Sequence, residues 1–170
     1  MNKLGMDMSA IIAESNMLLS KLQTGEYIRK NHKLPNGPII GVMTNVVDGD
    51  TIDVLVNHNG VYLEIVVRLA HINAPEMKGG NDRSKLAAKH SRDKLEKYIE
   101  FMSPKKLVYL DIHNVDPYKR YLSDVHFINN KLNNIEYSIN QWMLDRKYVT
   151  PYVGGSTKGI VFDETQFNFS

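Results

Sequence analysis

The segment Val61–Leu69 limits most narrowly what this chain can fold into, because every second residue in it is apolar. Alternation with a period of two is typical of a β-strand and places the apolar side chains on one face. The side chains of Tyr62, Glu64 and Arg68 then lie on the opposite face. This is the clearest strand in the sequence, and it predicts a fold built around a sheet.

Four further segments are rich in β-formers or alternate in the same way, and two have helical periodicity. The predicted strands are residues 39–47, 51–56, 107–112 and 121–127, and the predicted helices are residues 84–102 and 133–144. Helices that follow the third and fifth strands fit a small closed barrel of the OB type. We therefore predict an α+β, mainly β fold: a five-stranded OB-fold barrel with two to three helices, plus an N-terminal amphipathic helix.

The chain divides into three zones. Residues 1–38 form an arm in which apolar residues at helical spacing predict an amphipathic helix from about Ser9 to Leu22, followed by a linker. Residues 39–153 form the barrel domain, and residues 154–170 form a C-terminal tail. We favour packing of the helix on its own domain, with docking of a protein partner or self-association as the alternative. For the apolar tail residues we likewise favour docking on the domain, with a partner as the alternative; they are Ile160, Val161, Phe162, Phe167 and Phe169.

The composition excludes several classes of protein. The chain has 170 residues and no cysteine, which excludes disulfides, cysteine-ligated zinc and a thiol nucleophile. No apolar run reaches the length of a membrane span, and the first residues lack the continuous apolar stretch of a signal peptide. We therefore expect a soluble protein with no membrane association. Residues 78–106 carry more basic than acidic residues, which can attract phosphates, although a solvated helix face is the commoner explanation.

Three short segments carry residues suited to chemistry on phosphate. They are residues 47–51 (VDGDT), residues 67–76 (VRLAHINAPE) and residues 116–121 (DPYKRY). Each alone has a simpler explanation: Asp50 as a turn residue, or Arg68 and Glu76 as a surface ion pair. Together and in this order they resemble the staphylococcal nuclease (thermonuclease) family, and the resemblance runs from about Ile40 to Tyr152.

Hydrolysis of a phosphodiester needs a hard cation, a positioned water and positive charge on the phosphate oxygens. Asp50 is a carboxylate at the start of a strand and is the first candidate metal ligand. Pro75 restricts the backbone of Ala74 and so makes its carbonyl a second candidate. The resemblance implies that Glu76 is the general base or positions the water, and that Arg68 and Arg120 bind the reacting phosphate.

The sequence departs from the family pattern at residues that bind the metal and the nucleotide in that family. Asn73 stands where the family commonly has a second metal-binding Asp, so the site loses one negative charge and should bind Ca²⁺ more weakly. The nucleotide-gripping Lys of the family falls on Pro117, where Tyr118 or Lys119 could substitute. Tyr152 matches one of the two tyrosines that flank the nucleotide.

The resemblance implies a hydrolase: a metal-dependent endonuclease that cuts single-stranded DNA or RNA with little sequence specificity, by in-line attack of a metal-positioned water. Its implied ion is Ca²⁺, with Mg²⁺ or Mn²⁺ as alternatives. Because family members are often exported and this chain shows no export signal, we expect an intracellular or nucleic-acid-packaged role. The alternative is an OB-fold module that binds nucleic acid or serves in assembly, with weak or absent catalysis.

Overall fold

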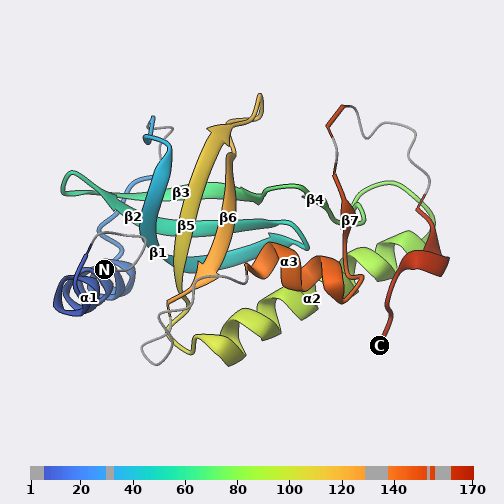
Figure 1. The fold of residues 1–170 in the computed structure, drawn as a ribbon, viewed down its shortest axis with the longest axis horizontal. Coiled ribbons are helices and arrows are strands. Elements are labelled where there is room, and N and C mark those ends of the chain that lie inside the picture. The colour runs from blue at the N-terminus through green and yellow to red at the C-terminus, as the bar shows by residue number, and fades with distance from the viewer. Residues whose placement is uncertain (1–5, 30–32, 129–137, 153, 156–161) are drawn as a thin grey trace.

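The computed structural model describes residues 6–29, 33–128, 138–152, 154–155 and 162–170 of the chain (Figure 1). Five strands close into a barrel in the order β1-β2-β3-β6-β5. The strands are β1 (Gly37–Asp48), β2 (Thr51–His58), β3 (Val61–Leu69), β5 (Leu107–Val115) and β6 (Tyr121–Phe127). Neighbouring strands run antiparallel except β3 and β6, which are parallel. The predicted α+β fold with an OB-like barrel is confirmed.

A tight turn sets the register of β2 against β3. Asn59 and Gly60 join β2 to β3, and both have positive φ, at 53° and 83°. This is the backbone that a two-residue Asn-Gly hairpin requires. The hairpin pairs Thr51 with Arg68 at its far end. Residues at the start of β2 and the end of β3 therefore lie side by side.

The barrel interior is filled by the inward face of the strands and closed by two helices. Buried members include Ile52, Val54, Leu63, Ile65 and Val67. Helix α2 (Asp82–Met102) contributes Leu95 and Ile99, and α3 (Ile139–Asp145) contributes Ile139 and Met143.

Both helices begin where a polar side chain caps the first turn. Asn81 accepts a hydrogen bond from the Ser84 N–H, so α2 begins two residues before the predicted Ser84. Ser138 accepts from the Gln141 N–H, and α3 begins at Ile139 instead of the predicted Asn133. Residues 133–137 of that prediction lie outside the described residues.

Helix α1 (Met8–Thr24) packs on the outside of the barrel. Asp7 caps its N-terminus, and Gly25 ends it in the left-handed conformation. The buried residues of this interface are Ile11 and Leu18 from the helix and Ile40, Val42 and Leu55 from β1 and β2. The helix therefore packs on its own domain, as we favoured from the sequence.

The segment after α1 pairs with the barrel at one point. The Ile28 N–H donates to the Tyr62 carbonyl, and the Glu64 N–H donates to the Ile28 carbonyl, each at 3.0 Å. This short bridge lies on the part of β3 that precedes its three pairs with β6 at residues 67–69. The linker thus covers a stretch of strand edge that β6 does not reach.

The remaining elements are a two-stranded sheet and a short 3-10 turn. A two-stranded sheet joins β4 (Ile72–Asn73) to β7 (Thr150–Pro151), and a 3-10 turn, η1, spans Glu164–Gln166. The Asn168 N–H donates to the Lys147 carbonyl at 3.0 Å, and the Arg83 guanidinium lies 4.1 Å from the Phe169 ring centre. The tail therefore docks on the barrel domain, as predicted for Phe167 and Phe169; Ile160 and Val161 lie outside the described residues.

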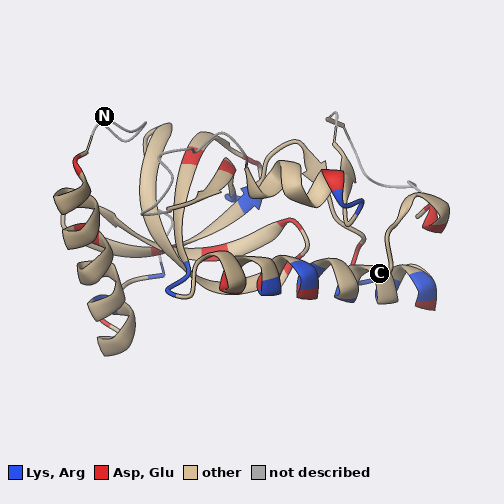
Figure 2. Cartoon of the chain, turned by 60° about the horizontal axis from the view of Figure 1, so that its bottom comes forward, with Lys and Arg blue, Asp and Glu red and all other residues tan. Residues whose placement is uncertain are grey.

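Acidic and basic residues are intermingled along α2, as the colours of Figure 2 show. Arg92 contacts Asp93, and Lys85 is 4.0 Å from Asp82 one turn away. This mixture is typical of a solvated helix face. Among the described residues, no helix combines the length and apolar character needed to cross a membrane.

Candidate active site

Asp50 and Arg68 come together because of the strand register. Thr51 is paired with Arg68, and the Leu69 N–H donates to the Asp50 carbonyl at 2.8 Å. Asp50, which directly precedes β2, therefore lies beside the last residues of β3. Two of the three sequence motifs meet here.

The Asp50 carboxylate is buried, and both of its oxygens have partners. Its Oδ1 accepts a hydrogen bond from the Thr51 hydroxyl at 2.9 Å, and its Oδ2 accepts from the Ala74 N–H at 2.5 Å. The same Oδ2 lies 3.0 Å from Nη1 of Arg68. The side chains of Asp50 and Arg68 are only 7% and 10% exposed, so this ion pair lies inside the protein, not on its surface.

Arg68 is fixed by three hydrogen bonds to the ends of β3 and β4, besides its ion pair with Asp50. Nη1 also donates to the carbonyls of Ile72 at 2.9 Å and Leu69 at 3.3 Å, and Nη2 donates to Oδ1 of Asn73 at 3.1 Å. The guanidinium carbon lies 5.9 Å from the ring centre of Tyr152. Among the described residues, Nε of Arg68 has no hydrogen-bond partner, which leaves one donor for a further anion.

Burial raises the pKa of Asp50 from its ordinary value of 3.8 to about 7. The neighbouring Asp48 carboxylate raises the pKa as well, whereas the Arg68 guanidinium and the Ala74 N–H act in the opposite direction. Asp48 is held close because its Oδ1 accepts the Asp50 N–H at 3.1 Å. The carboxylates of Asp48 and Asp50 and the guanidinium of Arg68 thus form one cluster of charged groups.

The close approach of α2 explains the glycine between these two aspartates. A Cβ at Gly49 would lie 1.9 Å from the hydroxyl oxygen of Ser91 and 3.0 Å from the Cβ of Ala74. Any larger residue would push the turn away from α2 and from Ala74. Gly49 therefore keeps Asp50 within reach of the Ala74 N–H.

Asn73 and Ala74 are held next to Asp50 by the small β4–β7 sheet. Asn73 pairs with Thr150, whose hydroxyl donates to the Asn73 carbonyl at 3.3 Å. Ala74 is buried, and Pro75 follows it. The three predicted metal ligands, Asp50, Asn73 and Ala74, are therefore adjacent.

Oxygen donors of this kind suit a hard cation such as Ca²⁺. The side-chain oxygens of Asp50 and Asn73 also contact Arg68, so an ion bound to them would share both atoms with the guanidinium. In the described part of the chain, no group of three or more His, Cys, Asp or Glu side chains is placed to hold a metal ion. These oxygen donors are of the chemical type that binds a divalent cation. The candidate ligand set consists of one carboxylate, Asp50, with the amide oxygen of Asn73 and the carbonyl of Ala74.

Glu76 lies in a cleft of about 640 Å³ that Asn73, Ala74 and Tyr152 also line. Glu76 is exposed, and within the described residues its carboxylate has no hydrogen-bond or ion-pair partner. Arg68 pairs with Asp50, so the alternative of an ion pair between Glu76 and Arg68 is wrong. The Glu76 carboxylate is therefore available to solvent or to a ligand in the cleft.

Arg120 is positioned by the loop that joins β5 to β6. Asp116 accepts from Nε of Arg120 at 2.7 Å and from the backbone N–H groups of Arg120 and Tyr118 at 2.9 Å. Arg120 directly precedes Tyr121, which is paired with Val67 next to Arg68. The third motif therefore enters the barrel on the strand beside the first arginine, and among the described residues both Nη atoms of Arg120 lack partners.

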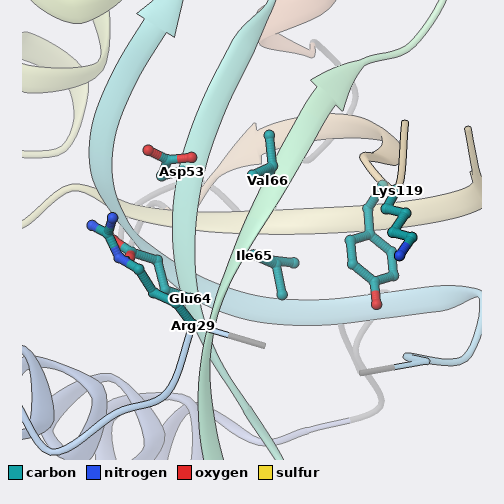
Figure 3. A pocket seen from close by; sticks show the side chains of 7 residues that line it. Arg29, Asp53, Glu64, Ile65, Val66 and Lys119 are labelled. Carbon is teal, nitrogen blue, oxygen red and sulfur yellow. The ribbon is translucent and has the colours of Figure 1, made fainter. Parts of the chain in front are cut away.

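The three predicted nucleic-acid-binding residues lie in three different places and do not form one site. Tyr152 lines the cleft beside Glu76, and its backbone N–H donates to the His71 carbonyl. Tyr118 is 81% exposed and lies 5.5 Å from the Arg120 guanidinium. Lys119 instead lines a second cavity of about 240 Å³ with Arg29 and Glu64, and Figure 3 shows it across this cavity from them.

Two groups of residues near this site were missed in the sequence: Asp48, and the tail residues that line the cleft. Asp48 was not predicted, although the Asp-x-Asp spacing of residues 48–50 could have indicated it. The tail residues Phe162, Asp163, Gln166 and Phe167 line the cleft beside Glu76. The unusual apolar character of the tail was the available signal, but it did not indicate where the tail docks.

The sequence matches no protein-family model and no curated protein. The resemblance to the nuclease family therefore depends on the three motifs and their residues.

Proposed function

We propose that this protein is a metal-dependent nuclease that hydrolyses phosphodiester bonds of DNA and RNA with little sequence preference. The observation that carries the proposal is the buried Asp50–Arg68 pair packed against Asn73 and Ala74, with the Glu76 carboxylate, unpaired among the described residues, in the adjoining cleft. Burying a charged pair costs free energy, and titratable groups with shifted pKa values concentrate at functional sites.

In this proposal Asp50, Asn73 and the Ala74 carbonyl would hold the ion, Ca²⁺ in the first place, with Mg²⁺ or Mn²⁺ as alternatives. When bound, the ion would polarise the phosphate and lower the pKa of a coordinated water. Weak retention of the ion is expected, because Asn73 contributes no charge and affinity depends on the number of charged ligands.

The side chains of the protein have separate tasks in this reaction. Glu76 orients the attacking water and accepts its proton, because its carboxylate is free of other partners in the described residues. Arg68 donates through Nε and Arg120 through its Nη atoms to the non-bridging phosphate oxygens. The contacts of Arg68 to two carbonyls and of Arg120 to Asp116 keep both guanidiniums oriented before substrate binds.

The decisive experiment is cleavage of a fluorescent single-stranded DNA in EDTA, Ca²⁺, Mg²⁺ and Mn²⁺. Cutting should need one of the ions and should fall about 10²- to 10⁴-fold in Glu76→Gln. Glu96→Gln, an isosteric change on α2, is the matched control and should cut like the wild type. Cutting that persists in EDTA, or that Glu76→Gln leaves unchanged, would contradict the proposal.

A second candidate is an OB-fold module that binds nucleic acid without cutting it. The specific observation in its favour is that Arg68 already contacts both side-chain oxygens expected to hold the ion. Asn73→Asp separates the two candidates. Metal-dependent cutting by Asn73→Asp but not by the wild type would indicate a barrel that keeps its catalytic groups and lacks its ion. An EDTA-insensitive gel shift with no cutting by either protein would favour the binding module.

An assembly role could accompany either activity. Met8 and Ile12, four residues apart on one side of α1, remain 38% and 47% exposed after its other face packs on the barrel. We propose that this outer face is where a protein partner or a second copy would bind. Sedimentation of the wild type and of Ile12→Lys tests this, because an unchanged mass and an unchanged set of partners would exclude it.

A further inference from the structure

The cleft beside Glu76 has walls from segments that are far apart in the sequence. One wall comes from residues 73–76 with Lys78, and another from the tail segment, which we define as residues 162–170. In Figure 1 this red segment lies beside the N-terminal part of α2. The cleft shares Glu76 with the proposed site, but Arg68 and Arg120 do not line it.

The tail segment is anchored independently of any ligand. The Arg83 Nε donates to Glu164 at 2.8 Å, and the Arg83 guanidinium covers the Phe169 ring. The Ser170 carbonyl lies 3.2 Å from Nε2 of His90 and 3.4 Å from the Tyr148 hydroxyl. These contacts hold the tail on both α2 and the segment that follows α3.

The anchoring presents aromatic surface to the cleft. Phe167 lines the cleft, and its ring centre lies 5.7 Å from that of Phe162 and 4.8 Å from that of Phe169. The Phe167 ring is half-buried and fixed by these neighbours. Tyr152 adds a second ring to the lining, and its hydroxyl donates to the Gly155 carbonyl at 2.7 Å.

Polar groups lie beside the rings. Asp163 and Gln166 line the same cleft, with Nε2 of Gln166 donating to Asp163 at 3.0 Å, and Lys78 supplies a positive charge. A nucleobase offers a flat face for a ring and donors and acceptors along its edge. Among the described residues, the lining carries the carboxylates of Glu76 and Asp163 against the one cation, Lys78, so the rings and the polar groups, and not the net charge, are what match a base. They match it more closely than they match a purely apolar ligand.

We propose that this cleft binds a single unstacked nucleobase of the substrate strand, with Phe167 as its stacking surface and the tail segment as a wall of the subsite. The proposal rests on the proposed function and narrows it to single strands, because a paired base cannot leave the duplex without cost. Phe167 would then contribute to substrate affinity and not to the chemical step.

The test compares a fluorescein-labelled ten-thymidine strand with the same strand built from abasic residues, by fluorescence anisotropy in EDTA, where metal-dependent cutting is blocked. The wild type should bind the strand with bases more tightly. Phe167→Leu, which keeps apolar volume and removes the ring, should weaken that binding about five- to 150-fold, the range for loss of one base–aromatic stack. It should leave binding of the abasic strand unchanged.

Phe101→Leu is the matched control, because Phe101 is 82% exposed on α2 and does not line the cleft. It should bind both strands like the wild type. Equal weakening of both strands by Phe167→Leu, with an altered melting temperature, would overturn the proposal in favour of a structural role. Equal binding of both strands by the wild type would overturn it as well.

The outcomes separate this inference from the proposed function. Base-dependent binding that needs Phe167, in a protein that never cuts, would support the subsite and exclude the nuclease. Metal-dependent cutting with no effect of Phe167→Leu on either strand would support the nuclease and exclude the subsite.

Discussion

Two regions of the barrel are buried to a similar degree and are stabilised in opposite ways. Under α1, Leu18 and Leu55 meet in an interface whose buried members are almost all apolar. Where β2 begins and β3 ends, Asp50 and Arg68 are buried, with side-chain exposures of 7% and 10%. Removing apolar surface from water favours folding directly, whereas removing two charges from water opposes it.

The difference shows which region the fold needs. The apolar interface stabilises the fold, and a chain without α1 would expose apolar side chains of β1 and β2 to water. The charged pair has no such advantage over apolar residues of similar size, although it organises Thr51, Asn73 and Ala74 around one carboxylate. A costly arrangement of this kind is best explained by a function, and the following experiments test that explanation.

The largest effect is expected for Arg68→Met. At pH 8, above the pKa of about 7 of Asp50, the variant must keep the buried carboxylate without its cation or take up a proton, which should cost about 3–5 kcal/mol in the free energy of unfolding. In the folded fraction, cleavage should fall a further 100- to 1000-fold or so, the usual loss for one charge-stabilising donor. Urea unfolding and single-turnover cleavage measure the two effects. A variant of normal stability would show that the pair does not need its cation.

Leu18→Ala should affect stability alone. It removes a fully buried side chain between α1 and the barrel, which should cost about 2–5 kcal/mol. The cleavage rate of the folded protein should stay unchanged, because α1 contributes no residue to the candidate site. A large loss of rate at a temperature where the variant is folded would mean that the two regions are coupled.

The double variant Asp50→Asn, Arg68→Met should recover much of the stability that Arg68→Met loses. Asn keeps an acceptor for the Ala74 N–H, and no uncompensated buried charge remains. We expect an interaction energy of about 0.5–3 kcal/mol in the double-mutant cycle, with no recovery of cleavage. Additive losses would show that the two side chains act on stability separately.

The most gradual effect is a slope in the dependence of stability on pH, of at most about 1.4 kcal/mol per pH unit. Because the pKa of Asp50 is about 7 in the folded protein and ordinarily 3.8, the folded state binds the extra proton between these values. The stability of the wild type relative to Asp50→Asn should therefore be highest below about pH 4, fall as the pH rises and level off above about pH 7. Thermal melts in EDTA test this, and a difference that grows with pH would show that pairing with Arg68 outweighs burial.

The local patterns predicted the barrel well because its strands alternate cleanly and its turns contain Asp-Gly and Asn-Gly. Val61–Leu69 and Tyr121–Phe127 have the predicted bounds. The predicted helix included Ser138, which instead caps α3, and residues 133–137 of that prediction lie outside the described residues.

Parts of the site depend on contacts that periodicity cannot show. The adjacency of Asp50, Arg68, Asn73 and Ala74 follows from the register and from the β4–β7 pairing. The separation of Lys119 from Tyr152 depends on the path of a loop, and the tail reaches the cleft only through docking across α2. None of these long-range contacts leaves a pattern in the local sequence.

The bridge at Ile28 also bears on how copies of this chain behave at high concentration. β6 pairs with residues 67–69 of β3, and Ile28 occupies backbone groups of Tyr62 and Glu64 on the edge beyond. Val61 and Val66 are partly exposed on the same strand. An uncovered strand edge with apolar neighbours is a template for adding another strand. By occupying it, the linker after α1 protects the barrel against edge-to-edge aggregation, and a chain cut within that linker would recruit further copies of itself.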